Sequence, residues 1–228
     1  MFTPLGDNTP MRAIRVQYVT MAIIFLNFVI FLWTGAMQGD EALMITATGF
    51  GVVPTEILDV ARNTGGELNP VAEPVTLVTY MFLHGGWMHL LGNMLFLWVF
   101  ADNIEDVFGH TAFVFFYLLT GIAGAVLHVA LYPDSQEPLI GASGAVSGVL
   151  ASYLLLFPRA RVLVLIFMAI PMRLPAIVVL GGWIALQFYH ILADDNAGEA
   201  IAWWAHIGGF AAGLILTLIF RSRLRLAN

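Results

Sequence analysis

The sequence predicts an all-α membrane protein: a bundle of six transmembrane helices with a long, partly membrane-embedded first outer loop. Three observations lead to this fold class. The chain of 228 residues is 60% hydrophobic and only 11% charged, with a mean hydropathy of +0.86. Six apolar runs approach the roughly 20 residues that a helix needs to cross a bilayer core of about 30 Å. Arginines and acidic residues also separate onto opposite sides of such a bundle.

Composition excludes several classes of protein. A chain this apolar has too little polar surface to cover a soluble globule, so we expect one membrane domain over residues 1–228. All nine basic residues are arginines and the net charge is −6, so no cationic patch for a nucleic acid is expected. Cysteine is absent, which excludes disulfides, thiolate metal sites and a cysteine nucleophile.

The elements follow in order along the chain. A short tail, 1–16, precedes a first span near 17–37, which we interpret as a retained anchor because it is too long for a signal-peptide core and no A-x-A-like site follows. Residues 38–83 form the outer loop, expected to lie partly in the interface and to pack on the bundle. The other five spans are expected at about 87–102, 111–131, 142–157, 174–192 and 203–220. An arginine-rich tail follows at 221–228.

One apolar segment, 162–170, is too short to cross a bilayer, and we interpret it as a buried or re-entrant segment. The positive-inside bias then orients the bundle. With the N-terminus inside, eight of the nine arginines lie inside, and only Arg62 lies outside. Eleven of the fifteen acidic residues lie in the outer loops, so the charge separates into +4 inside and −10 outside. Both termini are therefore expected in the cytoplasm.

Four polar side chains lie within the apolar runs, where each needs a partner or a water-filled cavity. His89 and Asn93 lie near the outer part of the second span, Ser143 at the outer start of the fourth, and His206 in the sixth. With the predicted topology all four lie toward the outer face. They can therefore converge at one depth.

Glycines accompany the serine and the last of these histidines. Ser143 lies in Gly141-Ala142-Ser143-Gly144, and Gly209 and Gly213 follow His206 by three and seven residues on the same helix face. Glycine lets two helix backbones approach closely. The sixth helix is therefore expected to dock on the fourth, within reach of a Ser–His hydrogen bond of about 2.6–3.2 Å.

This pairing favours nucleophilic catalysis. A serine hydroxyl needs a base to remove its proton, and histidine titrates in a suitable range. No carboxylate lies at the same depth, so a Ser143–His206 dyad is favoured over a triad. The oxyanion would be held by the Ser143 backbone N–H and by His89 and Asn93, which are four residues apart on one helix face. His84 and His89 diverge on a helix and no H-E-x-x-H motif is present, so no metal or other cofactor is expected.

Other functions are compatible with polar groups in a bundle. Serine and glycine in membrane helices more often pack than react, and a lone histidine can be a structural residue or a proton relay. A six-span transporter or channel is one alternative, but it would spread ionisable residues through the bilayer, whereas these gather near one face. A non-catalytic protein that holds membrane clients is the other. No oligomeric state is predicted.

The ordered motifs resemble the rhomboid intramembrane serine proteases, in their prokaryotic-type six-transmembrane form. The similarity covers most of the chain from about Gly51. It rests on Phe50-Gly51-Val52-Val53-Pro54, His84-x4-His89-x3-Asn93, Glu105 with Gly109, Gly141-Ala142-Ser143-Gly144, Phe157-Pro158-Arg159-Ala160-Arg161 and Ala205-His206-x2-Gly209-x3-Gly213.

The resemblance implies Ser143 as the nucleophile, His206 as the base, His89 and Asn93 at the oxyanion hole, and His84 as a supporting residue. It also implies an endopeptidase that cuts transmembrane proteins in or near their membrane helices through an acyl-enzyme and releases outward-facing fragments. A location in the bacterial inner membrane, with the active site toward the outer face, is expected on the same ground.

Two positions depart from the family's pattern. Many members carry an aromatic residue four positions after the serine, stacked on the catalytic histidine, but here that residue is Ser147. Other contacts must therefore orient His206. Many members also carry a Trp-Arg pair before the second span, where this chain reads Glu73-Pro74-Val75-Thr76, so the loop is expected to be anchored differently. Substrate entry is expected past the fifth span, which Gly181-Gly182 would soften.

Overall fold

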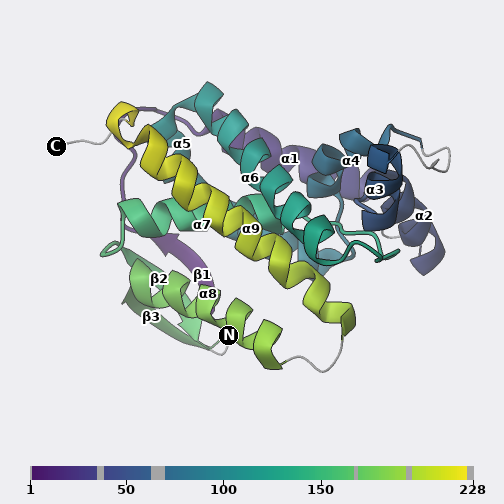
Figure 1. Cartoon of the computed structure of the whole chain (residues 1–228). Helices are drawn as coiled ribbons and strands as arrows, with labels where there is room; N and C mark the ends of the chain where they lie inside the picture. The colour runs from purple at the N-terminus through teal and green to yellow at the C-terminus, as the bar shows by residue number, and fades with distance from the viewer. Residues whose placement is uncertain (1, 35–38, 63–69, 167–168, 194–196, 225–228) are drawn as a thin grey trace.

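The computed structural model describes residues 2–34, 39–62, 70–166, 169–193 and 197–224. Helices form at all six predicted apolar runs, and α9 packs between α6 and α7 in the middle of the molecule (Figure 1). These helices are α1 (Tyr18–Trp33), α5 (Trp87–Phe108), α6 (His110–Leu131), α7 (Ser143–Leu156), α8 (Ala176–Ala193) and α9 (Ala197–Phe220).

The helices differ in how well they match the thickness of a bilayer. Among the described residues, two helical stretches, His110–Leu131 and Trp203–Arg223, are long and apolar enough to cross one. Helix α7 has only 14 residues, which corresponds to a rise of about 21 Å and is shorter than a bilayer core of about 30 Å. The fold is therefore mostly helical as predicted, whereas six full-length spans remain a prediction.

The outer loop packs on the bundle, as predicted. It contains α2 (Asp40–Phe50), α3 (Pro54–Arg62), α4 (Glu73–Thr79) and the 3-10 turn η1 (Tyr80–Phe82). The backbone of Val52 exchanges two hydrogen bonds with that of Leu139, at 2.8 and 3.0 Å. The hydroxyl of Tyr80, which is buried, donates to the carbonyl of Gly121 on α6 at 2.7 Å. These contacts anchor the loop, which lacks the Trp-Arg pair of many family members.

The segment 162–170, predicted to be buried or re-entrant, begins as a strand whose Val162 and Val164 are buried, so the buried interpretation fits and the re-entrant one does not. Strands β2 (Arg161–Ile166) and β3 (Ile170–Pro175) form an antiparallel hairpin around positions 167–168, which lie outside the described residues. Strand β1 (Phe2–Asp7), from the predicted tail, pairs with the other edge of β2. Val162 and Val164 are fully buried while Arg161 is exposed, which is the period-two pattern of a strand. Strand β2 lies between β1 and β3, so its backbone groups can pair on both sides.

A buried carboxylate connects the start of α1 to α5. Glu105 is fully buried on α5 and accepts hydrogen bonds from the backbone N–H groups of Val19 and Thr20, at 3.0 and 2.8 Å, and from the Thr20 hydroxyl, at 2.7 Å. Because α1 begins at Tyr18, these two N–H groups lie in its first turn and have no acceptor within the helix. Glu105 thus caps α1, and its negative charge lies at the positive end of the helix dipole.

Replacing Glu105 by Gln is therefore expected to lower the free energy of unfolding by about 3 kcal/mol. The amide NH2 group of Gln would face a backbone N–H group of α1, and two donors cannot form a hydrogen bond. Thermal unfolding in detergent micelles measures the effect. Glu137→Gln is the control, since Glu137 is exposed in the loop after α6. A melting temperature lowered no more by Glu105→Gln than by the control would contradict this role.

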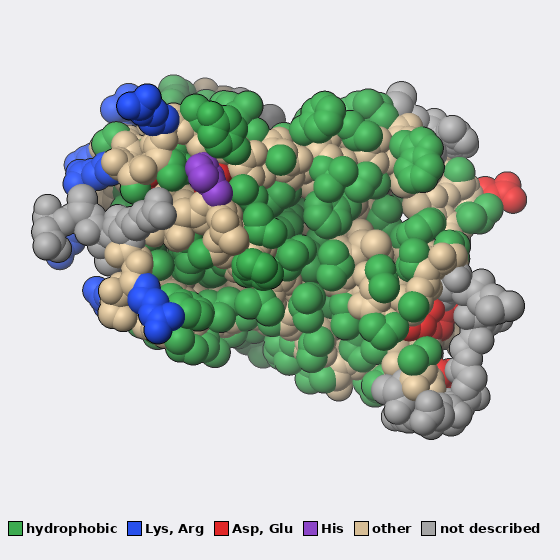
Figure 2. Space-filling view, turned by 90° about the horizontal axis from the view of Figure 1, so that it is seen from above, with side chains coloured by type: hydrophobic (Ala, Val, Ile, Leu, Met, Phe, Trp, Pro, Cys, Tyr) green, Lys and Arg blue, Asp and Glu red, His purple; other side chains and the backbone are tan. Residues whose placement is uncertain are grey.

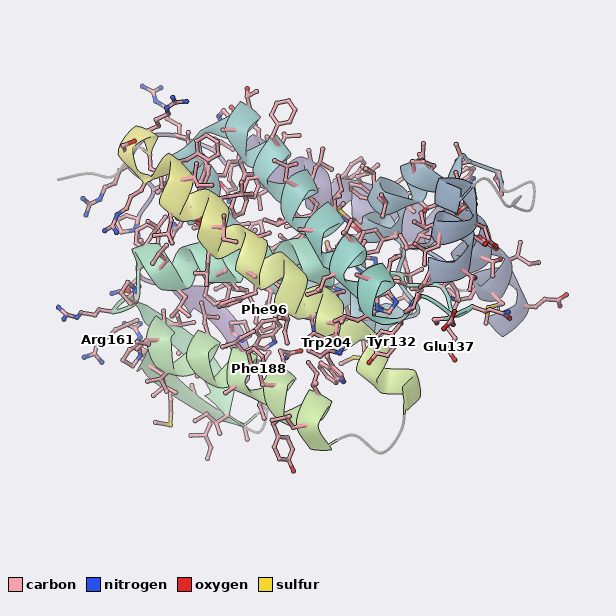
Figure 3. The ribbon with its side chains drawn as sticks, in the orientation of Figure 1. Phe96, Tyr132, Glu137, Arg161, Phe188 and Trp204 are labelled. Carbon is pink, nitrogen blue, oxygen red and sulfur yellow. The ribbon has the colours of Figure 1, made fainter. Side chains whose placement is uncertain are left out.

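Charged side chains gather at two ends of the molecule. Figure 2 shows arginines at one end, acidic groups at the other and a broad hydrophobic surface between them. Arg161 and Glu137 lie toward these opposite ends in Figure 3. The exposed hydrophobic residues include Phe25, Phe115 and Ile219, from three different helices. This distribution agrees with the charge partition predicted from the sequence.

Candidate active site

Ser143 is the first residue of α7. The preceding backbone is held by the outer loop, because the N–H of Gly141 donates to the carbonyl of Tyr80 at 2.9 Å. The first intrahelical bond runs from the N–H of Val146 to the carbonyl of Ala142. The N–H groups of Ser143 and Gly144 therefore lie in the first turn, where a helix has no internal acceptors and carries partial positive charge. Such a turn can stabilise a developing anion.

Because Gly141 has no side chain, the ring of His89 on α5 can come close to Ser143. The φ of Gly141, +128°, is unfavourable for residues with a Cβ. A Cβ placed there would lie 2.7 Å from Nε2 of His89 and 3.7 Å from Oγ of Ser143, so both side chains approach one point. The N–H of Gly85 donates to Nδ1 of His89 at 3.4 Å. The ring proton is thus placed on Nε2, which faces the Ser143 turn as a donor.

Glycines bring α9 into backbone contact with α7, as the small-residue pattern predicts. A Cβ placed on Gly209 would lie 1.9 Å from the carbonyl oxygen of Gly144, and one on Gly213 would lie 2.4 Å from that of Gly148. This contact lays the turn of α9 that carries His206 against the first turn of α7. Ser143 and His206 thus lie on adjacent turns of two helices in contact, although in the described chain no hydrogen bond joins their side chains.

His206 is held by α8 and by its own helix. Its Nδ1 lies 2.7 Å from Oε1 of Gln187 on α8. The rings of Trp183 and Trp203 both contact the imidazole, each with a centroid separation of 5.8 Å and with interplanar angles of 40° and 78°. Ser147 does not take part, because its hydroxyl donates to the Ser143 carbonyl at 2.6 Å. Tryptophans and an amide therefore replace the aromatic residue that the family pattern leads one to expect at that position.

The other predicted residues lie on α5 or next to it. Asn93 is buried and donates from Nδ2 to the carbonyl of His89 at 3.0 Å, one turn earlier. His84 is also buried, and its ring meets that of His89 edge-on at 5.0 Å. In the part of the chain that the structure describes, no three His, Asp or Glu side chains gather as a possible metal site.

Sequence reasoning missed Gln187. The signal was present, because it is an amide within an apolar run, the same criterion that singled out Asn93 and His206. Its proximity to His206 depends on how α8 packs against α9. That packing is not apparent from either segment alone.

Comparison with known proteins identifies the family. The rhomboid domain model matches residues 71–223. Rhomboid protein 1, mitochondrial, of Saccharomyces cerevisiae is 32% identical over 155 residues, which cover 64% of this chain and 41% of that protein. Presenilin-associated rhomboid-like protein, mitochondrial, of Mus musculus is 34% identical over 151 residues, which cover 63% of this chain and 37% of that protein. RHOMBOID-like protein 5 of Arabidopsis thaliana is 28% identical over 224 residues, which cover 91% of this chain and 69% of that protein.

The chain thus spans about two fifths of the length of the yeast and mouse proteins. Because both of these relatives are named as mitochondrial, they do not support the expected location in a bacterial inner membrane. The family match itself covers well over half of the chain. The chain therefore belongs to the rhomboid family of membrane proteins.

Proposed function

We propose that this chain is an intramembrane serine endopeptidase that hydrolyses peptide bonds in or near the transmembrane helices of other membrane proteins. One observation carries the proposal. The glycine contact between α7 and α9 lays the turn with His206 against the turn with Ser143, while Gly141 admits the His89 ring to the same place. A nucleophile, a base and hydrogen-bond donors thus come from three helices.

The reaction follows the chemistry of these groups. Oγ of Ser143 attacks the carbonyl carbon of the scissile bond while its proton passes to Nε2 of His206. The oxyanion of the tetrahedral intermediate accepts hydrogen bonds from the Ser143 N–H, from Nε2 of His89 and from the Asn93 amide. The C–N bond then breaks, and His206 protonates the leaving amine. Water, deprotonated by His206, hydrolyses the acyl-enzyme ester and restores the Ser143 hydroxyl.

The unbonded Ser143 and His206 side chains are compatible with this reaction. Hydrogen bonds at catalytic sites are often long or poorly aligned without substrate and tighten when substrate binds. The Gly144–Gly209 contact holds the two backbones together, so the bond is proposed to form by side-chain rotation when substrate binds.

The substrate is a membrane helix that must unwind to expose a peptide bond, so helix-breaking or small residues are expected near the cut. Entry from the bilayer is proposed beside α8, where a Cβ placed on Gly181 would meet nothing within 4 Å. With the arginine-rich end in the cytoplasm, the fragments that carry external domains would leave outward. A transporter or a client-holding protein needs no such reaction at Ser143.

Covalent labelling tests the proposal. A fluorophosphonate reacts with an activated serine, so purified protein in micelles is expected to be labelled at Ser143, and labelling is expected to be absent in Ser143→Ala and strongly reduced in His206→Ala. Ser147→Ala is the matched control, because it removes a buried hydroxyl one turn further along α7. Equal labelling of Ser143→Ala and the unaltered protein would contradict the assignment.

A further inference from the structure

Gln187 lies on α8 and is nearly buried, with 4% of its surface exposed. A buried primary amide in an apolar helix needs partners for both its oxygen and its nitrogen. Nε2 donates to the carbonyl of Trp183, one turn earlier, at 3.3 Å, and Oε1 lies 2.7 Å from Nδ1 of His206. Resting on the function proposed above, we infer that Gln187 is the positioning residue that sets the tautomer and orientation of His206.

The hydrogen bonds of Gln187 determine which nitrogen of His206 carries the proton. Since the Trp183 carbonyl can only accept, it faces the NH2 group of Gln187, and the amide oxygen is left to face His206. That oxygen can also only accept, so Nδ1 of His206 must be the donor. Nε2 of the neutral ring then carries a free lone pair, as a base that removes the serine proton requires.

Trp183 and Trp203 restrict the ring that Gln187 orients. Trp183 is one turn before Gln187 on α8, so one helix supplies both the hydrogen bond and a ring contact to His206. Trp203 contributes the second ring contact from α9 and stacks in turn on His190 of α8, with centroids 4.6 Å apart. Phe188 of α8 and Trp204 of α9, which are labelled in Figure 3, mark the region where these two helices face each other. The position of α8 thus sets the orientation of the base.

Gln187 itself is uncharged, so its role is to orient the ring and not to balance charge. Four other side chains with ionisable groups lie on the elements around His206, and none of them is altered in the Gln187 variants. They are His89 on α5, Tyr80 beside Gly144, His128 on α6 and His190 on α8.

Kinetics of a transmembrane-helix substrate in liposomes test the inference. Gln187→Met keeps the length of the side chain and removes the acceptor, so kcat is expected to fall by at least about tenfold with little change in KM. Gln187→Glu restores an acceptor and is expected to recover activity over Gln187→Met. The acid limb of its kcat/KM profile should move to higher pH, because a carboxylate stabilises protonated imidazole.

Asn27→Leu provides the matched control. Asn27 is a fully buried amide on α1 that also donates to a carbonyl one turn earlier, that of Ile23. Its loss is expected to leave kcat nearly unchanged. Equal kcat for Gln187→Met and the unaltered protein, or equal losses in Gln187→Met and Gln187→Glu, would overturn the inference.

A second measurement needs no catalysis. In the Ser143→Ala protein with 15N-labelled histidine, the 15N shifts of His206, assigned by comparison with His206→Ala, are expected to report the Nδ1–H tautomer at neutral pH. They should report a mixture of tautomers in Gln187→Met. An Nε2–H tautomer with Gln187 intact would overturn the inference. Persistent cleavage by Ser143→Ala would instead refute the proposed function, so the two failures are distinguishable.

Discussion

Cleavage of a transmembrane-helix substrate is expected to fall by at least about 10⁴-fold when either Ser143 or His206 is replaced by Ala. Without Ser143 no acyl-enzyme forms, and without His206 the serine proton has no acceptor. Because the two residues act as a unit, the double variant is expected to be no slower than either single variant. Initial rates of cleavage in liposomes, followed over the same substrate range for all three variants, measure these effects.

Ser147→Ala serves as the control, and its rate is expected to stay within a few-fold of the unaltered protein. His89→Ala and Asn93→Ala are expected to show intermediate losses of about 10²-fold each, since each removes one oxyanion donor and leaves the nucleophile intact. Undiminished cleavage in Ser143→Ala would rule out the proposed reaction. Multiplying losses in the double variant would rule out joint action of Ser143 and His206.

The helices could be predicted from the sequence because apolar runs are long and are interrupted by polar, glycine or proline residues. The third span was predicted at about 111–131 and α6 is His110–Leu131; the fourth was predicted at 142–157 and α7 is Ser143–Leu156. Helix length was harder to predict. The outer loop covers the buried start of α7, where Gly141 bonds to Tyr80. Helix α7 can therefore be shorter than the thickness of the bilayer.

The sheet could not be predicted from hydrophobicity. The segment around Val162 and Val164 is as apolar as a membrane helix, and a short apolar run does not distinguish a strand from a buried helix. Its partner β1 lies more than 150 residues away in the sequence. Pairing across such a distance depends on the tertiary fold.

The predicted site residues share one property, that a polar side chain in an apolar run needs a partner. This property identified Ser143 and His206, but not the contact that orients the histidine. Ser147 showed only that another contact was needed. Gln187 supplies that contact from α8, and the bond exists because α8 and α9 pack side by side.

Replacing Gly209 by Ala is expected to reduce kcat/KM by about 10²-fold and to destabilise the protein by about 1–3 kcal/mol. The added Cβ would lie 1.9 Å from the carbonyl oxygen and 2.7 Å from the carbonyl carbon of Gly144. Backbone atoms cannot rotate aside, so α9 must move away from α7, and His206 must move with it. A displacement of about 1 Å at a catalytic group is enough for a loss of this size.

Two further glycine variants separate packing from catalysis. Gly213→Ala would place a Cβ 2.4 Å from the Gly148 carbonyl oxygen, one turn further from His206. Gly213→Ala is expected to lower the melting temperature about as much as Gly209→Ala does, and to lower kcat/KM less. Gly181→Ala on α8 meets no atom within 4 Å and is expected to keep or slightly raise stability, since alanine favours helix over glycine. Normal melting and normal cleavage in Gly209→Ala would show that α7 and α9 do not touch at this turn, and the route by which His206 reaches Ser143 would then be wrong.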